Sequence, residues 1–226
     1  METVAKIVCI GNQKGGTGKS TGVTIIANYI SQKTKYSILV VDADDLQQTL
    51  MKFREIDLLK GYSIEDLYHL VHISSNDFPK MSQGFVTDYD FIFIDLPGNL
   101  KQEGVISCYN LVDYLFIPTG TSIADIDSTI KFIDLYREKV VPIRSHHGAK
   151  TQIYSYLSRV KRNTNDYKAA KENRIFEKIG VPMMENDISE TVSLQSNATT
   201  AEVYSSLIKT NDYEAFCKEF LKIIKN

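Results

Sequence analysis

The sequence predicts an α/β fold, a single domain built on a mainly parallel, twisted sheet with helices on both faces. Short apolar runs rich in β-branched residues recur along the chain, and longer segments with helical spacing separate most of them. Charged or glycine-rich stretches follow the ends of several runs. Strands that alternate with helices are joined by right-handed crossovers, which make the strands parallel and place helices on both faces.

The expected strands are residues 4–10, 37–41, 91–94, 114–117 and 153–157, with a shorter one near Val181. The expected helices are 19–32, 101–111, 123–139 and 167–179. Residues 53–89 are harder to interpret, although Ser63 precedes "IEDLYHL" as a helix N-cap would. The 226 residues contain no internal repeat and no Pro- or Ser-rich linker, so we expect one domain over 1–226.

Composition excludes several classes of protein. The chain is 43% hydrophobic with a net charge of -2, so its overall charge does not indicate nucleic acid binding. No apolar run approaches the ~18–20 residues of a membrane span, and the first strand begins too early for a signal peptide. Cys9, Cys108 and Cys217 lie far apart without a C-x-x-C pair. This spacing argues against a zinc or iron–sulfur site and for a reducing cytoplasm.

The stretch "GNQKGGTGKST", residues 11–21, follows the first expected strand and precedes a helix. Glycines let several backbone N–H groups point toward one centre, and the helix N-terminus adds partial positive charge, which together form a cradle for phosphates. Lys19 is placed to reach the β- and γ-phosphates, Ser20 to bind Mg²⁺, and Thr21 to lie near the α-phosphate. The expected nucleotide contacts in this loop are Lys14, Gly15, Gly16, Thr17, Gly18, Lys19, Ser20 and Thr21.

The loop has a second lysine, and "NQKGGTGKST" resembles the deviant Walker A box, K-G-G-x-G-K-[ST], of the ParA/MinD ATPases. Gln13 stands where the general phosphate-loop pattern has glycine, as in the Soj-like ParA branch. The resemblance implies ATP and Mg²⁺ as cofactors and a homodimer that forms on ATP binding. In that dimer Lys14 reaches the nucleotide of the other subunit, whereas Lys19 serves its own. A cation supplied by a partner stabilises charge on the transferred phosphoryl group, as arginine fingers do.

Two more apolar runs end in carboxylates. "DFIFIDLPG" reaches Asp95 in the Walker B form, which predicts that Asp95 holds Mg²⁺ through a water, with helix capping as the alternative. "SILVVDADDLQQ" resembles the D-x-D-P-Q pattern of the ParA family, although the proline is absent and Gln47 is displaced by one. The resemblance implies that Asp42 helps to hold the magnesium and that Asp44 orients the attacking water.

The resemblance also implies that adenine contacts a late loop, which corresponds here to "IFEKIGVPMMENDISET". Pro182, Met183 and Glu185 are the expected contacts. A methionine sulfur packs well against an aromatic ring, so this assignment is chemically reasonable. Simple filling of the core explains the same residues equally well.

Local charge predicts a DNA surface. Residues 144–178 contain nine Lys/Arg and three Asp/Glu, in contrast to the near-neutral whole chain. Basic residues that follow a strand and recur every three or four positions on the expected helix suit nonspecific contact with a phosphate backbone, with a solvated helix face as the alternative. The candidates are Arg159, Lys161, Arg162, Lys168, Lys171, Arg174 and Lys178.

Together these residues and the resemblance imply a slow, Mg²⁺-dependent ATPase with Lys14, Lys19 and Asp44 as catalytic side chains. The implied task is partition of a plasmid, chromosome or other cargo on nonspecific DNA, in the cytoplasm on the nucleoid, with a ParB-like adaptor protein. Two alternatives remain, a membrane-surface positioning ATPase like MinD and an ATP-gated scaffold with little hydrolysis. We expect the tail "DYEAFCKEFLKIIKN" to close the core rather than bind membrane, because only three lysines flank its apolar face.

Overall fold

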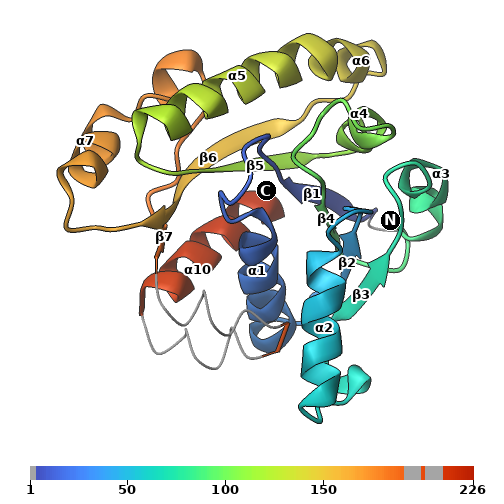
Figure 1. Ribbon diagram of the computed structural model, residues 1–226. Coiled ribbons are helices and arrows are strands. Elements are labelled where there is room, and N and C mark those ends of the chain that lie inside the picture. Colours follow the sequence, from blue (N-terminus) through green and yellow to red (C-terminus); the bar gives the residue numbers. More distant parts are fainter. Residues whose placement is uncertain (1–3, 191–199, 202–210) are drawn as a thin grey trace.

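The computed structural model describes residues 4–190, 200–201 and 211–226, and its strands form one parallel sheet (Figure 1). The sheet has seven strands in the order β3-β2-β4-β1-β5-β6-β7 within these described residues. Every neighbouring pair of strands is parallel, which confirms the predicted fold class. The strands are β1 (Lys6–Ile10), β2 (Ile38–Asp42), β3 (His69–His72), β4 (Phe91–Asp95), β5 (Tyr114–Thr119), β6 (Gln152–Val160) and β7 (Ile188–Ser189).

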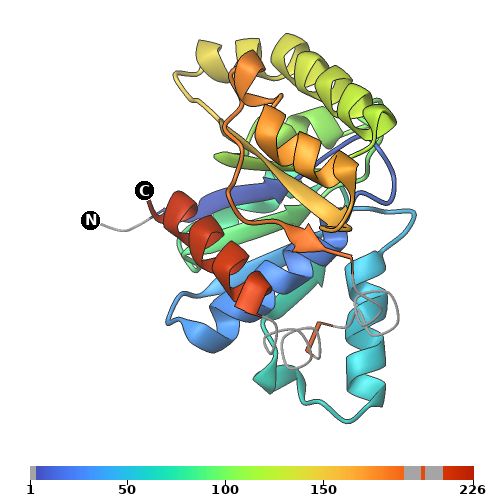
Figure 2. The same ribbon diagram turned by 90° about the vertical axis from the view of Figure 1, so that its left-hand side faces the viewer.

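Both faces of the sheet are covered by helices because both faces of its strands are apolar. In β1, Ile7 and Cys9 enter one buried cluster and Val8 and Ile10 enter the other. Helices α3 (Phe78–Met81), α4 (Val105–Tyr109) and α5 (Ile123–Lys139) cover the first face. Helices α1 (Lys19–Lys33), α2 (Thr49–Leu59) and α10 (Asn211–Lys225) cover the second (Figures 1 and 2).

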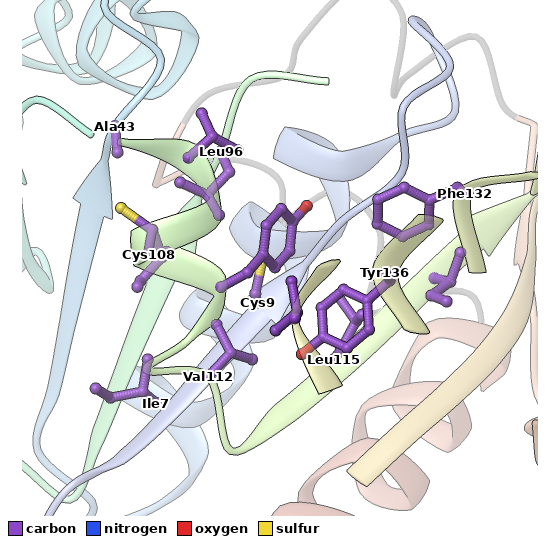
Figure 3. Packing of buried hydrophobic residues seen from close by; sticks show 14 of the residues in the cluster. Ile7, Cys9, Ala43, Leu96, Cys108, Val112, Leu115, Phe132 and Tyr136 are labelled. Atoms are coloured by element: carbon purple, nitrogen blue, oxygen red, sulfur yellow. The ribbon is translucent and has the colours of Figure 1, made fainter. Parts of the chain in front are cut away.

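The bounds expected for α5 are confirmed, and its sequence explains them. Ser122 accepts a hydrogen bond from the Asp125 backbone N–H at 3.1 Å, and the Asp125 carboxylate accepts one from the Ser122 N–H at 3.4 Å. This capping box satisfies two amides that the helix leaves unpaired. Phe132 and Tyr136, one turn apart, then pack onto the sheet beside Cys9 and Leu115 (Figure 3). The box therefore fixes where α5 begins, directly after the end of β5.

The prediction of a helix after Ser63 is wrong. Ser63 caps only the 3-10 turn η1 (Ile64–Asp66), and His69 begins the edge strand β3. An edge strand of four residues gives too short a pattern to distinguish from a helix. Near Val181 the expected strand is reduced to a single bridge between Ser155 and Met183, while β7 lies further along the chain. The other short helical elements are η2 (Ser82–Gly84), α6 (Val141–His146), α7 (Asn165–Asn173) and η3 (Glu177–Ile179).

The helix expected over 167–179 is also corrected. Helix α7 ends at Asn173, and Arg174 adopts a left-handed conformation with φ of 41° before the turn η3. Arg174 is held there by the Glu177 carboxylate at 2.7 Å and the Met183 carbonyl at 2.6 Å. The bond to Met183, which lies outside the predicted helix, together with the local bond to Glu177, overrides helix propensity. The basic residues of this region therefore do not form one continuous helical stripe.

Helix α10 closes the core, as expected from its sequence. It lies beside α1 (Figure 2), and Phe216, Phe220 and Ile224 are fully buried. The ring of Phe220 stacks on that of Phe116 with 3.7 Å between centroids. The apolar face that a membrane-binding tail would insert is thus already packed against the sheet.

Replacing Phe220 with alanine is expected to lower the free energy of unfolding by about 3–5 kcal/mol, because a buried ring is lost and a cavity remains. Lys222→Ala on the exposed face of the same helix should change it by less than about 0.5 kcal/mol. Urea unfolding followed by circular dichroism measures both. Equal stability of the two variants would show that α10 does not belong to the core.

Candidate nucleotide-binding site

The candidate site is a cleft at the carboxyl edge of the sheet. β1, β2 and β4 are neighbours there, and Asp42 at the end of β2 pairs in register with Asp95 at the end of β4. In open parallel sheets ligands bind beyond this edge. The cleft has a volume of about 1310 Å³. Its lining includes these residues predicted from sequence: Gly15, Gly16, Gly18, Lys19, Ser20, Thr21, Asp44 and Asp95.

The glycines of the loop are required by its shape. Gly16 and Gly18 have φ of 73° and 93°, which L side chains rarely adopt. A Cβ at Gly18 would also lie 2.6 Å from the Ser158 hydroxyl oxygen. On the opposite wall, a Cβ at Gly98 would lie 2.7 Å from the carbonyl oxygen of Gln13. The loop therefore fits tightly between the end of β6 and the turn after β4, with its backbone facing the cleft.

Asn12 anchors this loop, and sequence reasoning missed it. Its buried amide donates to the Pro118 carbonyl at 2.8 Å and to the Thr129 hydroxyl at 3.0 Å. Its side-chain oxygen accepts from the backbone N–H of Lys14 at 3.1 Å. Because a buried amide with all of these partners has little freedom, it holds the loop against β5 and α5. The sequence offered one sign of this role, a polar residue shortly after the end of a strand.

Lys19 lines the cleft at the start of α1. Its ammonium donates to the Lys14 carbonyl oxygen at 3.3 Å. Burial lowers the pKa of Lys19, while the carboxylates of Asp95 and Asp44 oppose that shift. Among the described residues the ammonium has one hydrogen-bond partner, so two further N–H donors are available for an anion. This position is what phosphate binding requires.

Asp95 and Ser20 fit a magnesium ion. The Asp95 Oδ1 atom is buried without a hydrogen-bond partner among the described residues. Burial raises the pKa of Asp95 to about 7, with Asp42 and Asp44 adding to the shift and Ser20 and Lys19 opposing it. The described residues contain no group of three His, Cys, Asp or Glu that could hold a metal without other ligands. Mg²⁺ prefers one or two protein oxygens together with waters and phosphates, so this donor set suits it.

The pH dependence of stability tests this burial. Between about pH 4 and pH 7 the folded Asp95 retains a proton that the unfolded chain has released, so the folded protein binds more protons. The ligand-free protein should therefore lose stability as the pH rises through this window. Asp95→Asn should not lose this stability. Above pH 7 its free energy of unfolding should exceed that of the wild-type protein by about 2–4 kcal/mol. Urea unfolding at pH 5 and pH 8 gives the comparison, and a pH-independent difference would contradict it.

Asp42 and Asp44 hold different positions. Asp42 is fully buried, and its Oδ2 accepts from the N–H groups of Leu50 and Met51 at 3.0 and 3.1 Å. It therefore caps α2 from behind the cleft, and burial raises its pKa. Asp44 lines the cleft, and its Oδ1 accepts from the N–H groups of Leu46 and Gln47. These bonds fix the direction of the Asp44 carboxylate.

Lys14 is paired within its own subunit. Its ammonium forms a salt bridge with Asp125, the capping-box residue of α5. The hydrogen bonds of Lys14 and Ser122 lower the pKa of Asp125 although burial opposes them. Sequence reasoning missed Asp125, because the S-x-x-D pattern indicates only a helix cap. Lys14 therefore does not line the cleft, although its neighbours Gln13 and Gly15 do.

Arg159 lies over the phosphate loop, although the sequence placed it on the DNA surface. It has a left-handed φ of 55°, and its guanidinium donates to the Gly16 carbonyl at 2.7 Å. Glu190, 3.5 Å from Arg159, also lines the cleft. Five of the seven proposed DNA contacts form ion pairs with carboxylates, namely Arg159, Lys161, Arg162, Lys171 and Arg174. Lys168 and Lys178 are exposed.

The three residues expected near adenine do not line the cleft. Met183 is buried in the core, where it forms a bridge with Ser155. Glu185 is 3.0 Å from Arg174. Pro182 is exposed, and its carbonyl accepts from the Ser155 N–H at 2.8 Å. Core filling accounts for Met183, so the adenine contacts remain a proposal without support from this geometry.

Comparison with known protein families also indicates a nucleotide-binding protein. Residues 8–203 match the CobQ/CobB/MinD/ParA nucleotide binding domain. An iron-sulfur cluster carrier protein of Rickettsia prowazekii (strain Madrid E) is 26% identical over 170 residues, which are 63% of this chain and 52% of that protein. The matched region therefore spans about half the length of that curated relative.

No helix in the described part of the chain is long and apolar enough to cross a membrane.

Solved structures share the fold across almost the whole chain. The pNOB8 ParA bound to nonspecific DNA is 19% identical with a TM-score of 0.72, covering 99% of both chains. A protein assigned to plasmid partition in Borrelia burgdorferi B31, bound to AMPPNP, is 22% identical with a TM-score of 0.68, covering 97% of this chain and 99% of that one. The Pyrococcus furiosus cell division ATPase MinD is 20% identical with a TM-score of 0.67, covering 97% and 99%. This chain belongs to the CobQ/CobB/MinD/ParA nucleotide-binding family, the family of the ParA and MinD P-loop ATPases.

Proposed function

We propose that this protein is a ParA-type ATPase that pairs on binding ATP, binds DNA nonspecifically as the pair, and hydrolyses ATP to ADP and phosphate. Its task is to partition a plasmid, chromosome or other cargo, with a ParB-like adaptor as the stimulating partner. The observation that carries the proposal is the pair of lysines in one glycine-rich loop. Lys19 lines its own cleft, whereas Lys14 does not line it and is held outside by Asp125, which leaves Lys14 available to a second subunit.

The residues of the cleft divide the chemistry between them. The loop amides and Lys19 bind the triphosphate, and Ser20 and Asp95 hold Mg²⁺, with Asp42 fixing α2 behind them. When bound, Mg²⁺ would supply positive charge that offsets the charge of the phosphates. The fixed carboxylate of Asp44 orients a water in line with the γ-phosphate. Lys14 of the partner subunit completes the site and stabilises charge on the transferred group.

DNA binding is proposed through the phosphate backbone. Ion pairs inside the subunit reduce the charge that Arg162, Lys171 and Arg174 offer to DNA. Exposed Lys168 and Lys178 are therefore the stronger candidates in this region. Pairing of two subunits doubles the surface, which supports a dependence of DNA affinity on ATP. Backbone contacts also make the affinity fall steeply with salt.

The alternatives differ in observable ways. A MinD-like membrane role needs an accessible apolar tail, and the buried Phe216 and Phe220 oppose it. An iron–sulfur carrier role, suggested by the name of the Rickettsia relative, needs accessible thiolates. Here the chain's three cysteines are free and buried, and burial raises the pKa of Cys9, Cys108 and Cys217.

The decisive experiment measures pairing, binding and hydrolysis on one preparation. Light scattering with AMPPNP and Mg²⁺ should show dimers, and gel shifts should show DNA binding that requires the nucleotide. Phosphate release should exceed that of Asp44→Asn. Equal DNA binding with and without nucleotide would contradict the ATP switch. Nucleotide-dependent sedimentation with anionic liposomes, without DNA binding, would support the MinD-like alternative.

A further inference from the structure

We propose that Asp125 is a positioning residue for Lys14. It holds the Lys14 ammonium within the unpaired subunit and releases it only when two ATP-loaded subunits meet, so it sets how tightly they pair. The proposal rests on the pairing in the proposed function. Its direct basis is the salt bridge between residues that lie 111 positions apart in the chain.

The Asp125 carboxylate is built to receive a cation. Its Oδ2 atom accepts the Ser122 hydroxyl at 2.5 Å and the Ser122 N–H at 3.4 Å, which leaves Oδ1 for Lys14. Gly120 makes room for this orientation, because a Cβ there would lie 2.3 Å from Asp125 Oδ2 and 2.7 Å from its Cγ. The carboxylate is therefore fixed from two sides before Lys14 arrives, and Lys14 loses little further freedom by binding it.

Lys14 can leave Asp125 without disturbing the loop. Its backbone N–H is held by Asn12, and its carbonyl accepts from Lys19 and from the Thr17 hydroxyl. Only the side chain has to move, and it is 37% exposed compared with 22% for Asp125. A second subunit can thus draw the ammonium away by rotation of side-chain bonds alone.

The salt bridge competes with pairing. Each subunit whose Lys14 is held by Asp125 must break that bond before its ammonium reaches the partner's nucleotide. Only subunits in which this salt bridge is broken can pair. The apparent affinity of pairing is therefore reduced in proportion to the fraction of subunits in that state. Since the pair is partly exposed to solvent, its effect on pairing is limited to a modest factor.

The test measures the dimer dissociation constant by analytical ultracentrifugation with AMPPNP and Mg²⁺. Asp125→Asn removes the charge but retains an oxygen for the cap, and it should tighten pairing about fivefold. Asp127→Asn is the matched control. It removes a carboxylate two residues along the same helix, one that pairs at 2.7 Å with Lys131 rather than with Lys14. This control should leave the dissociation constant unchanged.

A second variant tests the same contact without changing charge. Gly120→Ala places a methyl group against Asp125 and turns its carboxylate away from Lys14. It should also tighten pairing, whereas AMPPNP binding to single subunits at low protein concentration should stay unchanged in both variants. If Asp125 had only a structural role, the variants would not change the dimer dissociation constant while leaving nucleotide binding unchanged. Gly120→Ala also decides the question if Asp125→Asn does not fold.

Three outcomes would overturn the proposal. Unchanged pairing in both variants would show that the salt bridge does not restrain Lys14. Weaker pairing would show that Asp125 acts across the interface instead. A shift of equal size in Asp127→Asn would assign the effect to general charge on α5. In all three cases the wild-type protein still forms dimers with AMPPNP, whereas a wild-type protein that stays monomeric would contradict the proposed function itself.

Discussion

Replacing Lys14 with alanine is expected to lower the rate of ATP hydrolysis about 10³-fold. In the proposed mechanism, the negative charge on the transferred phosphoryl group then has no cation from the partner subunit to stabilise it. Dimers of this variant with AMPPNP should also be lost, since the phosphates of both subunits would remain unbalanced, whereas a dimer that retains one Lys14 balances one of its two nucleotides. Binding of nucleotide to single subunits should persist, because Lys19 and the loop amides are intact. Phosphate release, ultracentrifugation and nucleotide fluorescence measure the three quantities.

Lys131→Ala is the matched control for this change. Lys131 is an exposed lysine of α5 whose ammonium pairs with Asp127, away from the loop. It should retain the wild-type rate and the wild-type dimers. If Lys14→Ala hydrolysed ATP as fast as this control, Lys14 would have no part in the reaction, and the reason for two lysines in the loop would have to be sought elsewhere.

Asp44→Asn is expected to lower turnover by about 10²–10⁴-fold while preserving nucleotide binding and pairing. The asparagine side-chain oxygen can still accept the N–H groups of Leu46 and Gln47, so the turn should persist. Only the negative charge that orients water is removed. Single-turnover hydrolysis with excess enzyme separates this step from nucleotide exchange.

Asp45→Asn serves as the neighbouring control for Asp44. Asp45 lies 3.6 Å from His72 at the edge of the sheet and does not line the cleft. Its loss should change turnover little. Wild-type turnover no faster than that of Asp44→Asn would favour the scaffold alternative, in which ATP acts as a switch with little hydrolysis.

The site was predictable from sequence wherever neighbouring residues define it. The loop of residues 11–21 has its chemistry and its supporting strand and helix side by side in the chain, and Asp95 directly ends a buried strand. Asp125 and Arg159 were misassigned or missed because their partners Lys14 and Gly16 lie more than a hundred residues away. A capping pattern and a basic residue each have a common local explanation that conceals a distant contact.

Elements at the margin of the fold were predicted less well than those at its centre. Buried strands such as β4 carry long apolar runs, whereas β3 has an exposed histidine at each end. Helix α7 stops before Arg174, whose side chain is held by Glu177 three residues on and, beyond the predicted helix, by Glu185 and the Met183 carbonyl, contacts that helix propensity does not encode. Two other carboxylates, those of Asp187 and Glu190, pair with further basic residues that the composition alone counted as available to DNA.

Mixing two inactive variants tests the central claim most directly, namely that Lys14 acts on the partner's nucleotide. In a mixed dimer of Lys14→Ala and Asp44→Asn, the subunit lacking Lys14 keeps its own Asp44 and receives Lys14 from its partner. Phosphate release should therefore return when the variants are combined, to at most about half the wild-type rate per dimer, because one of two sites is complete. If Lys14 served its own nucleotide, neither site of the mixed dimer would hold both groups, and the mixture would stay as inactive as its components.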